Sequence, residues 1–301
     1  MGNSVVCENN KQASQNLTFN ILEEKLQEEV GIVAVDLDVL KILNLCDKDG
    51  HFNISGQLLA DDNQIESSAI DIVRFGDNTK QILYKETISN KSILFHYDRA
   101  IEIFEQYYQY EEINGDGSEI KELIPKQAFK EVLANAIVHR DWEIDAHIHI
   151  LMYKDKIEIN SPGGLAGSIL EEEYLYRDLS VLRNPTIVNV FRSLNIITNT
   201  GTGIARINLK YNDSYSKPNY DFSNNRVSVM LPVVETDVTY LSEAESKIYF
   251  ILKEELELSR LQLDEKTGFN KYKTIRTLNK LVDKGAIRKR GDGPGTRYRL
   301  K

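Results

Sequence analysis

Three polar residues recur at four-residue intervals in one stretch of the chain: Glu131, Asn135 and His139. Four residues are slightly more than one helical turn, so these side chains lie along one line of a helix surface. A carboxylate in such a line can orient and deprotonate a water beside a phosphate, and an amide oxygen is a hard ligand for Mg2+. The same pattern is typical of the solvated edge of an amphipathic helix, so the triplet alone leaves both interpretations open.

The surrounding residues predict the helix that carries this triplet. Pro125 suits the first position of a helix that runs to about Arg140. Its buried face, at positions i, i+3, i+4, i+7 and i+8, consists of Phe129, Val132, Leu133, Ala136 and Ile137. The elements expected downstream are a hairpin of strands at 147–152 and 156–159, a helix at 185–194, a second helix opened by the turn Gly201-Thr202-Gly203, and a strand at 227–232.

The C-terminal end of the chain has a charge opposite to that of the rest. Residues 266–301 hold 12 Lys and Arg against 2 Asp and Glu, a balance of +10, whereas the first 265 residues hold 25 against 44, a balance of -19. The acidic part repels polyanions, but the basic end attracts them.

Three helices and a hairpin are predicted in this basic end. Ser242 and Glu245 form a capping box for the first helix, 258–266 is the second, and Asn270 caps a third at 271–284. The residues of the third helix expected to face inward are Ile275, Leu278, Leu281 and Val282. Two Arg-rich segments then flank a Gly-rich tip at 291–295, which predicts a basic hairpin.

The outward side of the third helix carries charged and short polar groups that suit phosphates and base edges. The residues expected to contact DNA are Lys271, Lys273, Arg276, Thr277, Lys280, Arg288, Lys289, Arg290 and Arg297. A solvated Lys-rich face is the plainer interpretation of the stripe alone. The order of three helices, a basic third helix and a basic hairpin resembles the winged helix-turn-helix family, which implies binding to double-stranded DNA.

Composition excludes several classes of protein. The chain has 301 residues, 41% of them hydrophobic, with few Gly and Pro, so it should fold into two or three domains. No apolar run approaches the roughly 18 to 20 residues of a membrane span, and the start lacks a secretory signal. Val6 stands where a myristoylation motif needs Ser or Thr, and Cys7 and Cys46 have neither zinc nor disulfide spacing. We expect a cytoplasmic protein without membrane contact.

Four blocks of sequence occur in a recognisable order. They run from Glu131 to Asp141, from Ile157 to Leu165, from Leu182 to Pro185 and from Gly201 to Ile207. With them, residues 17–301 resemble the RecG-like transcriptional regulators, whose C-terminal domain is grouped with the GHKL ATPases, the clan of DNA gyrase and the sensor histidine kinases. The family's usual N-terminal Schlafen-like AlbA domain is mostly absent, so we expect a shortened version or a fragment.

The resemblance implies an α+β chain with several parts. These are a flexible tail at 1–16, a small α/β domain at 17–118 that is the end of the AlbA-type region, a GHKL-like α/β sandwich at 119–235, and a winged helix-turn-helix at 236–301.

It also implies roles for individual residues, with ATP and Mg2+ as cofactors. Glu131 matches the water-activating carboxylate and Asn135 the magnesium ligand. The expected nucleotide-binding residues are Asn135, Ser161, Gly163, Gly164, Arg183, Gly201, Thr202 and Gly203. The first glycine pair would lie beside adenine, the second pair would hold phosphate, and Arg183 would cover the nucleotide. Where the clan has an Asp that accepts the adenine amino group, this chain has Asn160-Ser161-Pro162, so an uncharged oxygen would accept that bond.

We therefore expect a homodimeric, DNA-binding transcriptional regulator whose ATPase-like domain senses a nucleotide or serves as a dimer scaffold. The alternative is a working Mg2+-dependent ATPase of the GHKL type that acts on or with DNA. A helicase motor is excluded because G-x-x-x-x-G-K-[ST] does not occur. His139-Arg140-Asp141 copies the kinase catalytic tripeptide without its accompanying motifs, and His147 and His149 lack a third metal ligand.

Overall fold

The described part of the chain consists of two compact units. The computed structural model describes residues 17–114, 117–165, 167, 171–172, 181–197, 203–212, 214, 216–234, 241–255, 257–291, 293 and 295–300. The expected tail at 1–16 and two predicted phosphate-binding residues, Gly201 and Thr202, lie outside these ranges. The first unit contains the residues up to 212 with 216–234, and the second is built mainly from residues after 234. No helix in the described ranges is long and apolar enough to cross a membrane.

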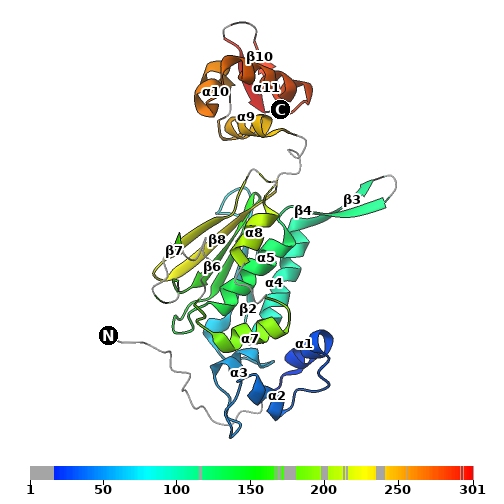
Figure 1. Ribbon diagram of the computed structural model, residues 1–301, viewed down its shortest axis with the longest axis vertical. Helices are drawn as coiled ribbons and strands as arrows, with labels where there is room; N and C mark the ends of the chain where they lie inside the picture. The colour runs from blue at the N-terminus through cyan, green and yellow to red at the C-terminus, as the bar shows by residue number, and fades with distance from the viewer. Residues whose placement is uncertain are drawn as a thin grey trace. The chain divides into compact units, whose positions relative to one another are not determined.

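A mixed six-stranded sheet forms the centre of the first unit, in the order β2-β1-β5-β6-β8-β7 (Figure 1). The strands are β1 (Ile70–Phe75), β2 (Ile82–Ile88), β5 (Ile148–Met152), β6 (Lys156–Pro162), β7 (Asn219–Ser223) and β8 (Arg226–Pro232). Strands β1 and β5 pair in parallel, and the other neighbours pair antiparallel. Alternate residues are buried, such as Ile157 and Ile159, because side chains of a strand point to opposite faces.

Helices pack against this sheet and share its core. They are α1 (Asn20–Val30), α2 (Leu37–Ile42), α3 (Ile54–Leu59), α4 (Ile93–Tyr108), α5 (Lys126–Val138), α7 (Pro185–Ser193) and α8 (Gly203–Lys210), with a short 3-10 helix at Glu66–Ser68. Helix α5 lies beside α4 and α8 on one face (Figure 1). One apolar cluster joins Leu22 of α1, Ile70 of β1, Phe129 of α5 and Phe191 of α7.

The boundary predicted near residue 118 falls inside the first unit. It lies in a two-stranded hairpin, β3 (Gln109–Asn114) and β4 (Gly117–Glu122), that leaves the body of the unit (Figure 1). Strand β1 pairs with β5, so residues before and after this hairpin belong to one sheet. The second unit starts after Val234, within one residue of the expected boundary between 235 and 236.

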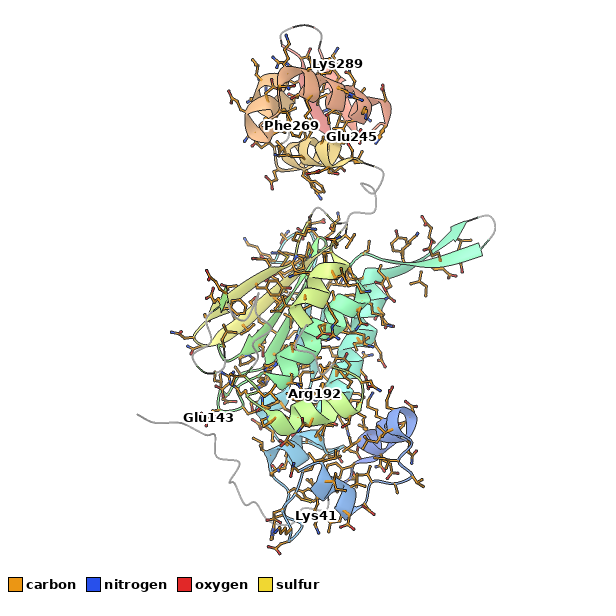
Figure 2. The ribbon with its side chains drawn as sticks, in the orientation of Figure 1. Lys41, Glu143, Arg192, Glu245, Phe269 and Lys289 are labelled. Atoms are coloured by element: carbon orange, nitrogen blue, oxygen red, sulfur yellow. The ribbon has the colours of Figure 1, made fainter. Side chains whose placement is uncertain are left out.

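The second unit contains three helices and a small antiparallel sheet in the order β10-β11-β9. Its elements are α9 (Glu243–Glu254), β9 (Leu258–Ser259), α10 (Arg260–Thr267), α11 (Lys271–Asp283), β10 (Ile287–Arg290) and β11 (Arg297–Leu300). The predicted capping box of Ser242 and Glu245 is confirmed, and Glu245 is labelled in Figure 2. Lys284 Nζ lies 2.8 Å from Glu245 Oε2. Burial acts to raise the pKa of Glu245, but the hydrogen bonds from Lys284 and Ser242 outweigh it and hold the pKa below its usual value.

Candidate functional site

Helix α5 presents Asn135 and His139 to a cavity of about 50 Å3 in the first unit. The cavity also contains three of the predicted nucleotide-binding residues, Ser161, Gly163 and Gly164. Its other walls are formed by Val132, Ala136, Ile159, Leu165, Val181, Ile204, Ile207, Tyr220, Val227 and Val229. The structure therefore brings the predicted magnesium ligand and the first glycine pair to one mostly apolar cavity.

Glu131 lies one helical turn before Asn135 and is only 4% exposed. Both of its carboxylate oxygens accept hydrogen bonds from Nη2 of Arg206, each at 2.7 Å. Arg206 comes from α8, so the ion pair fastens α8 to α5. The charged donor at both oxygens holds the Glu131 carboxylate in one orientation, directed at α8.

Gly203 begins α8 directly against these two side chains. A Cβ at this position would lie 2.6 Å from Oε1 of Glu131 and 3.2 Å from Nδ2 of Asn135. Glycine is thus required here by the close approach of α8 to α5.

The glycine pair after β6 is held equally closely. Gly163 has a positive φ of 99°, and a Cβ there would lie 2.5 Å from Nη1 of Arg183. A Cβ on Gly164 would lie 2.5 Å from the carbonyl oxygen of Ser223, in the turn between β7 and β8. Contacts within the protein therefore account for both glycines, whether or not a ligand approaches them.

Arg183 does not line the cavity, but it holds two backbone segments that do. Its Nη1 donates to the carbonyl of His139 at 3.0 Å and its Nη2 to the carbonyl of Gly164 at 3.1 Å. Both terminal nitrogens thus tie the end of α5 to the glycine pair.

Two further groups at the cavity have defined hydrogen-bonding states. The hydroxyl of Ser161 donates to the carbonyl of Ala136 at 2.7 Å, which leaves its oxygen as an acceptor. Burial, with contributions from Arg183 and Arg192, lowers the pKa of His139 to about 4, so its ring is neutral at pH 7.

Helix α11 of the second unit buries Leu278 and Leu281 as predicted, and Val282 packs against the same core, but the rest of its inward face differs from the prediction. Its buried residues are Thr274, Thr277, Leu278 and Leu281, whereas Ile275 is 38% exposed. The prediction that Thr277 faces DNA and Ile275 the core is therefore wrong. The Thr277 hydroxyl donates to the carbonyl of Lys273 at 2.8 Å, which satisfies it inside the unit.

The exposed residues of α11 include four of the predicted DNA contacts and two that were missed. They are Lys271, Tyr272, Lys273, Arg276, Asn279 and Lys280. Tyr272, Arg276 and Asn279 are three or four residues apart and so share one outward stripe. Asn279 lies three residues after Arg276 on this outward stripe. It was missed because Thr277 was assigned to the outward face and Ile275 to the core.

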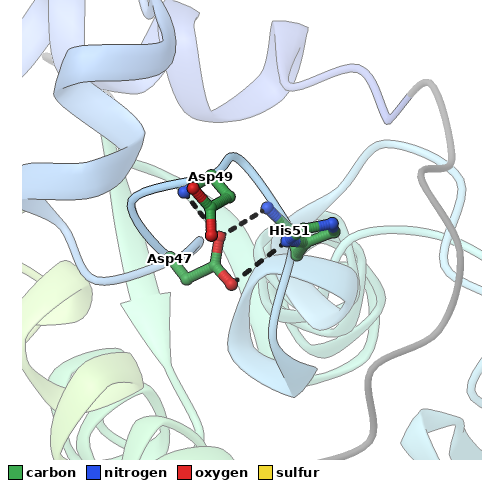
Figure 3. Close-up of side chains that lie close together, drawn as sticks. All are labelled: Asp47, Asp49 and His51. Carbon is green, nitrogen blue, oxygen red and sulfur yellow. Dashed lines mark hydrogen bonds and ion pairs between the residues drawn. The ribbon is translucent and has the colours of Figure 1, made fainter.

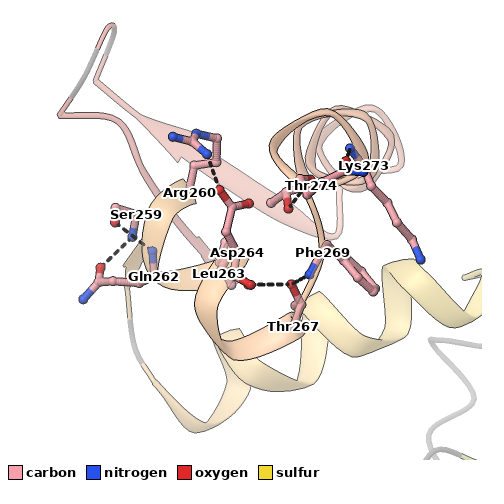
Figure 4. Close-up of polar contacts among 10 residues, drawn as sticks. Ser259, Arg260, Gln262, Leu263, Asp264, Thr267, Phe269, Lys273 and Thr274 are labelled. Carbon is pink, nitrogen blue, oxygen red and sulfur yellow. Dashed lines mark hydrogen bonds and ion pairs between the residues drawn. The ribbon is translucent and has the colours of Figure 1, made fainter.

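Lys273 is held at the start of α11 by an aromatic ring. Its Nζ lies 3.9 Å from the centre of the Phe269 ring, in the turn between α10 and α11 (Figure 4). The hydroxyl of Thr267 donates to the carbonyl of Leu263 at 2.6 Å and accepts from the N–H of Phe269 at 3.1 Å, so this turn is fixed.

The register of β10 and β11 sorts the basic residues of the C-terminal hairpin by face. Arg288 pairs with Arg299 and Arg290 with Arg297, and paired residues share a face of the sheet. These four residues are called the arginine face below. Lys289 pairs with Tyr298 on the opposite face. Arg299 was not among the predicted DNA contacts, and Lys289 was predicted to contact DNA together with the arginines although it lies on the other face.

An open hollow of about 540 Å3 lies at the arginine face. It is lined by Leu252, Lys253, Glu257, Arg288, Arg290, Arg299 and Leu300. Nη1 of Arg290 lies 3.9 Å from Oε1 of Glu257, so one carboxylate offsets part of this positive charge.

The histidine pair considered as a metal site has another explanation. Nδ1 of His147 lies 2.8 Å from Oδ2 of Asp71, and Nε2 of His149 lies 3.7 Å from the same oxygen. Within the described ranges, Asp47, Asp49 and His51 form the one group of three possible metal ligands (Figure 3). All three are exposed, and His51 and the N–H of Asp49 already bond to Asp47.

Comparison with known proteins supports a RecG-like, ATPase-like domain. Residues 145–231 match the family model described as "Putative ATP-dependent DNA helicase recG C-terminal". This match contains Gly163, Arg183 and Arg206 but not α5. No curated protein matches the chain.

Solved structures with a similar fold include the DIP2311 protein from Corynebacterium diphtheriae, with a TM-score of 0.63 and 17% identity. The alignment covers 95% of this chain and 63% of that one, so the present chain spans less than two thirds of its length. At this identity, the likeness concerns the fold alone.

Proposed function

We propose that the protein is a DNA-binding regulator whose second unit is a winged helix-turn-helix and whose first unit is a GHKL-type, nucleotide-sensing domain. Two observations carry the DNA-binding part: the exposed basic residues of α11 and, in the same unit, the arginine face of the hairpin. Arg276 and Asn279 offer the donor and acceptor groups that read guanine and adenine in the major groove. Arginines on a neighbouring hairpin suit the phosphates of the same duplex.

A salt titration tests this assignment. Replacing Lys273, Arg276 and Lys280 together by Ala should weaken duplex binding, because Arg276 loses its base contact and the two lysines lose phosphate contacts. The slope of log affinity against log salt should fall by about 1.8, or about 0.9 for each lysine that contacts a phosphate. Fluorescence anisotropy with a labelled duplex at several salt concentrations measures both quantities. Cation-π contact with Phe269 holds Lys273 near the helix start, so its contribution should be the smallest of the three.

The matched control removes the same charge elsewhere. Lys80, Lys85 and Lys154 are exposed in the first unit, and their triple Ala variant should keep the wild-type slope. Equal affinity and equal slope for the α11 variant and the wild type would contradict DNA contact through α11.

The nucleotide-sensing part rests on the cavity at α5. Ser161 can accept a hydrogen bond from an adenine amino group because its own proton is already donated to Ala136. Tyr220 and the valines of β8 offer apolar walls to a planar base. At about 50 Å3 the cavity is far smaller than the roughly 300 to 1,000 Å3 of pockets that enclose a small molecule, so a base enters only if the walls separate.

Calorimetric titration with a non-hydrolysable ATP analogue tests nucleotide binding. With Mg2+, Asn135→Ala should weaken binding about 10-fold because one metal ligand is lost; with EDTA, variant and wild type should bind equally. Asn189→Ala, at an exposed position of α7, is the matched control. Absence of binding with and without Mg2+ would leave the first unit a scaffold and contradict nucleotide sensing.

We propose binding rather than hydrolysis because of Arg206. A water-activating carboxylate has to be directed at the water, and both oxygens of Glu131 are directed at Nη2 of this arginine. The working ATPase is therefore the less favoured function.

A further inference from the structure

We infer that the β3–β4 hairpin, called the arm below, joins two copies of this chain by pairing strand β4 with β4 of the second copy. This inference is independent of the proposed DNA and nucleotide functions. It concerns a part of the first unit that takes no part in the cavity at α5.

The arm is a two-stranded sheet that extends away from the rest of the first unit (Figure 1). Every β4 residue except Lys121 is exposed, and Ile113 and Ile120 are 79% and 68% exposed. An isolated pair of strands is at best marginally stable in water, and an open strand edge is a template for further pairing. In the described part of the chain, β3 is the strand that pairs with β4.

The two isoleucines lie on one face of the arm. Ile113 pairs with Ser118 and Ile120 with Glu111, so Ile113 and Ile120 are diagonal neighbours on that face. The open edge beside Ile120 stops at the base of the arm, because the N–H of Val234 donates to the carbonyl of Leu123 at 2.6 Å. The available template is therefore β4 itself.

The charge of the arm excludes one class of partner. Its strands carry four glutamates and one lysine, in the segments QYEEIN and GSEIKE. Such a surface repels nucleic acid, so the occupant is a protein.

The order of charges along β4 identifies a second copy as that protein. When two β4 strands pair antiparallel about a two-fold axis at Ile120, each Glu119 faces Lys121 of the other copy, and the two Ile120 side chains meet. Two opposite-charge cross-strand pairs result. Pairing β3 with itself about Glu111 or Glu112 places that glutamate against its own copy, which is repulsive. No register of β3 with itself forms an opposite-charge pair, because β3 contains no lysine or arginine. Of the two strands of the arm, β4 is the one that can form opposite-charge pairs with its own copy.

The Ile113 and Ile120 side chains of both copies then line up across a four-stranded sheet. In the single chain Nζ of Lys121 lies 2.7 Å from Glu119 and 3.7 Å from Glu112, so pairing exchanges one partner of Lys121 for another. Strands this short bury little surface, and we expect a dissociation constant on the order of 10 µM.

Charge reversal in a mixing experiment tests the inference on the full chain. Sedimentation equilibrium across a broad range of concentrations should show a wild-type dimer. In a dimer of Glu119→Lys, the new lysine of each copy faces Lys121 of the other copy. In a dimer of Lys121→Glu, the new glutamate faces Glu119. Like charges then meet in both cases, so each variant should dimerise at least about 10-fold more weakly than the wild type. An equal mixture restores both opposite-charge pairs and should form heterodimers of wild-type affinity. Native mass spectrometry, with one variant labelled with 15N, distinguishes heterodimers from homodimers.

The mixture keeps the experiment decisive even if one variant alters the arm, because a misfolded arm cannot be rescued by its partner. Glu111→Lys, the same change on β3 but on the opposite face from Glu119 and Lys121, is the matched control and should leave the dimer intact. A monomer at all concentrations, a dimer that neither variant weakens, or a mixture no stronger than the single variants would each overturn the inference.

Discussion

Replacing Arg206 by Met should lower the free energy of unfolding of the first unit by about 3 kcal/mol. The change leaves the Glu131 carboxylate buried without the donor that now binds both of its oxygens. Breaking a buried ion pair costs roughly 3 to 5 kcal/mol, and the lower end applies because the Arg206 side chain is 32% exposed. Urea denaturation followed by circular dichroism measures the difference.

A second variant separates the ion pair from simple loss of packing. Adding Glu131→Gln to Arg206→Met removes the stranded charge and should recover part of the lost stability. Arg226→Met breaks the exposed pair with Asp221 and should change stability by less than about 0.5 kcal/mol. If Arg206→Met is as stable as the wild type, the ion pair has no structural role, and Glu131 is again a candidate for the general base of an ATPase.

Replacing all four residues of the arginine face by Gln should have the largest effect on DNA binding. If each contacts one phosphate, the slope of log affinity against log salt falls by about 3.6. When salt is raised from about 50 to about 200 mM, the factor by which wild-type affinity falls should then be roughly 150 times the factor for the variant. Anisotropy titrations with one duplex at both salt concentrations give this ratio.

The opposite face of the same hairpin provides the control. Lys289→Gln removes a neighbouring positive charge on the face shared with Tyr298. It should change the slope of log affinity against log salt by less than the roughly 0.9 expected for one phosphate contact. Near-ultraviolet circular dichroism checks that β10 and β11 still form. A fourfold variant with the wild-type slope would show that the arginine face does not meet the duplex.

Local patterns in the sequence predicted the elements of the second unit and part of the face that α11 buries. Asn270 caps α11 and the predicted range of 271–284 is within one residue of the helix observed. Leu278 and Leu281 are buried as predicted, but Thr277 was wrongly placed outside. It is buried beside Thr274 because both threonines donate their hydroxyls to carbonyls four residues earlier. A threonine that does so is compatible with the core, and hydropathy alone does not reveal it.

In the candidate site too, features set by neighbouring residues were predicted, whereas contacts between distant residues were not. The spacing of Glu131 and Asn135 correctly placed both on one helix, and the cavity contains Asn135 with Ser161 and the first glycine pair. The partner of Glu131 was not predictable, since Arg206 lies far along the chain and meets Glu131 only when α8 packs on α5. The parallel pairing of β1 with β5 is likewise a long-range contact without a local signal.

That parallel pairing has a consequence for how the polypeptide emerges from a ribosome. One edge of β1 stays unpaired until β5 has been synthesised, because Ile70 pairs with Ile148. Strand β7 joins the sheet through its pairing with β8, which ends at Pro232. The first unit therefore completes its sheet late in synthesis, whereas the second unit is assembled from near neighbours in the chain and should fold quickly. A truncated product ending near residue 118 would leave one edge of β1 bare, so it should aggregate rather than persist as a small independent domain.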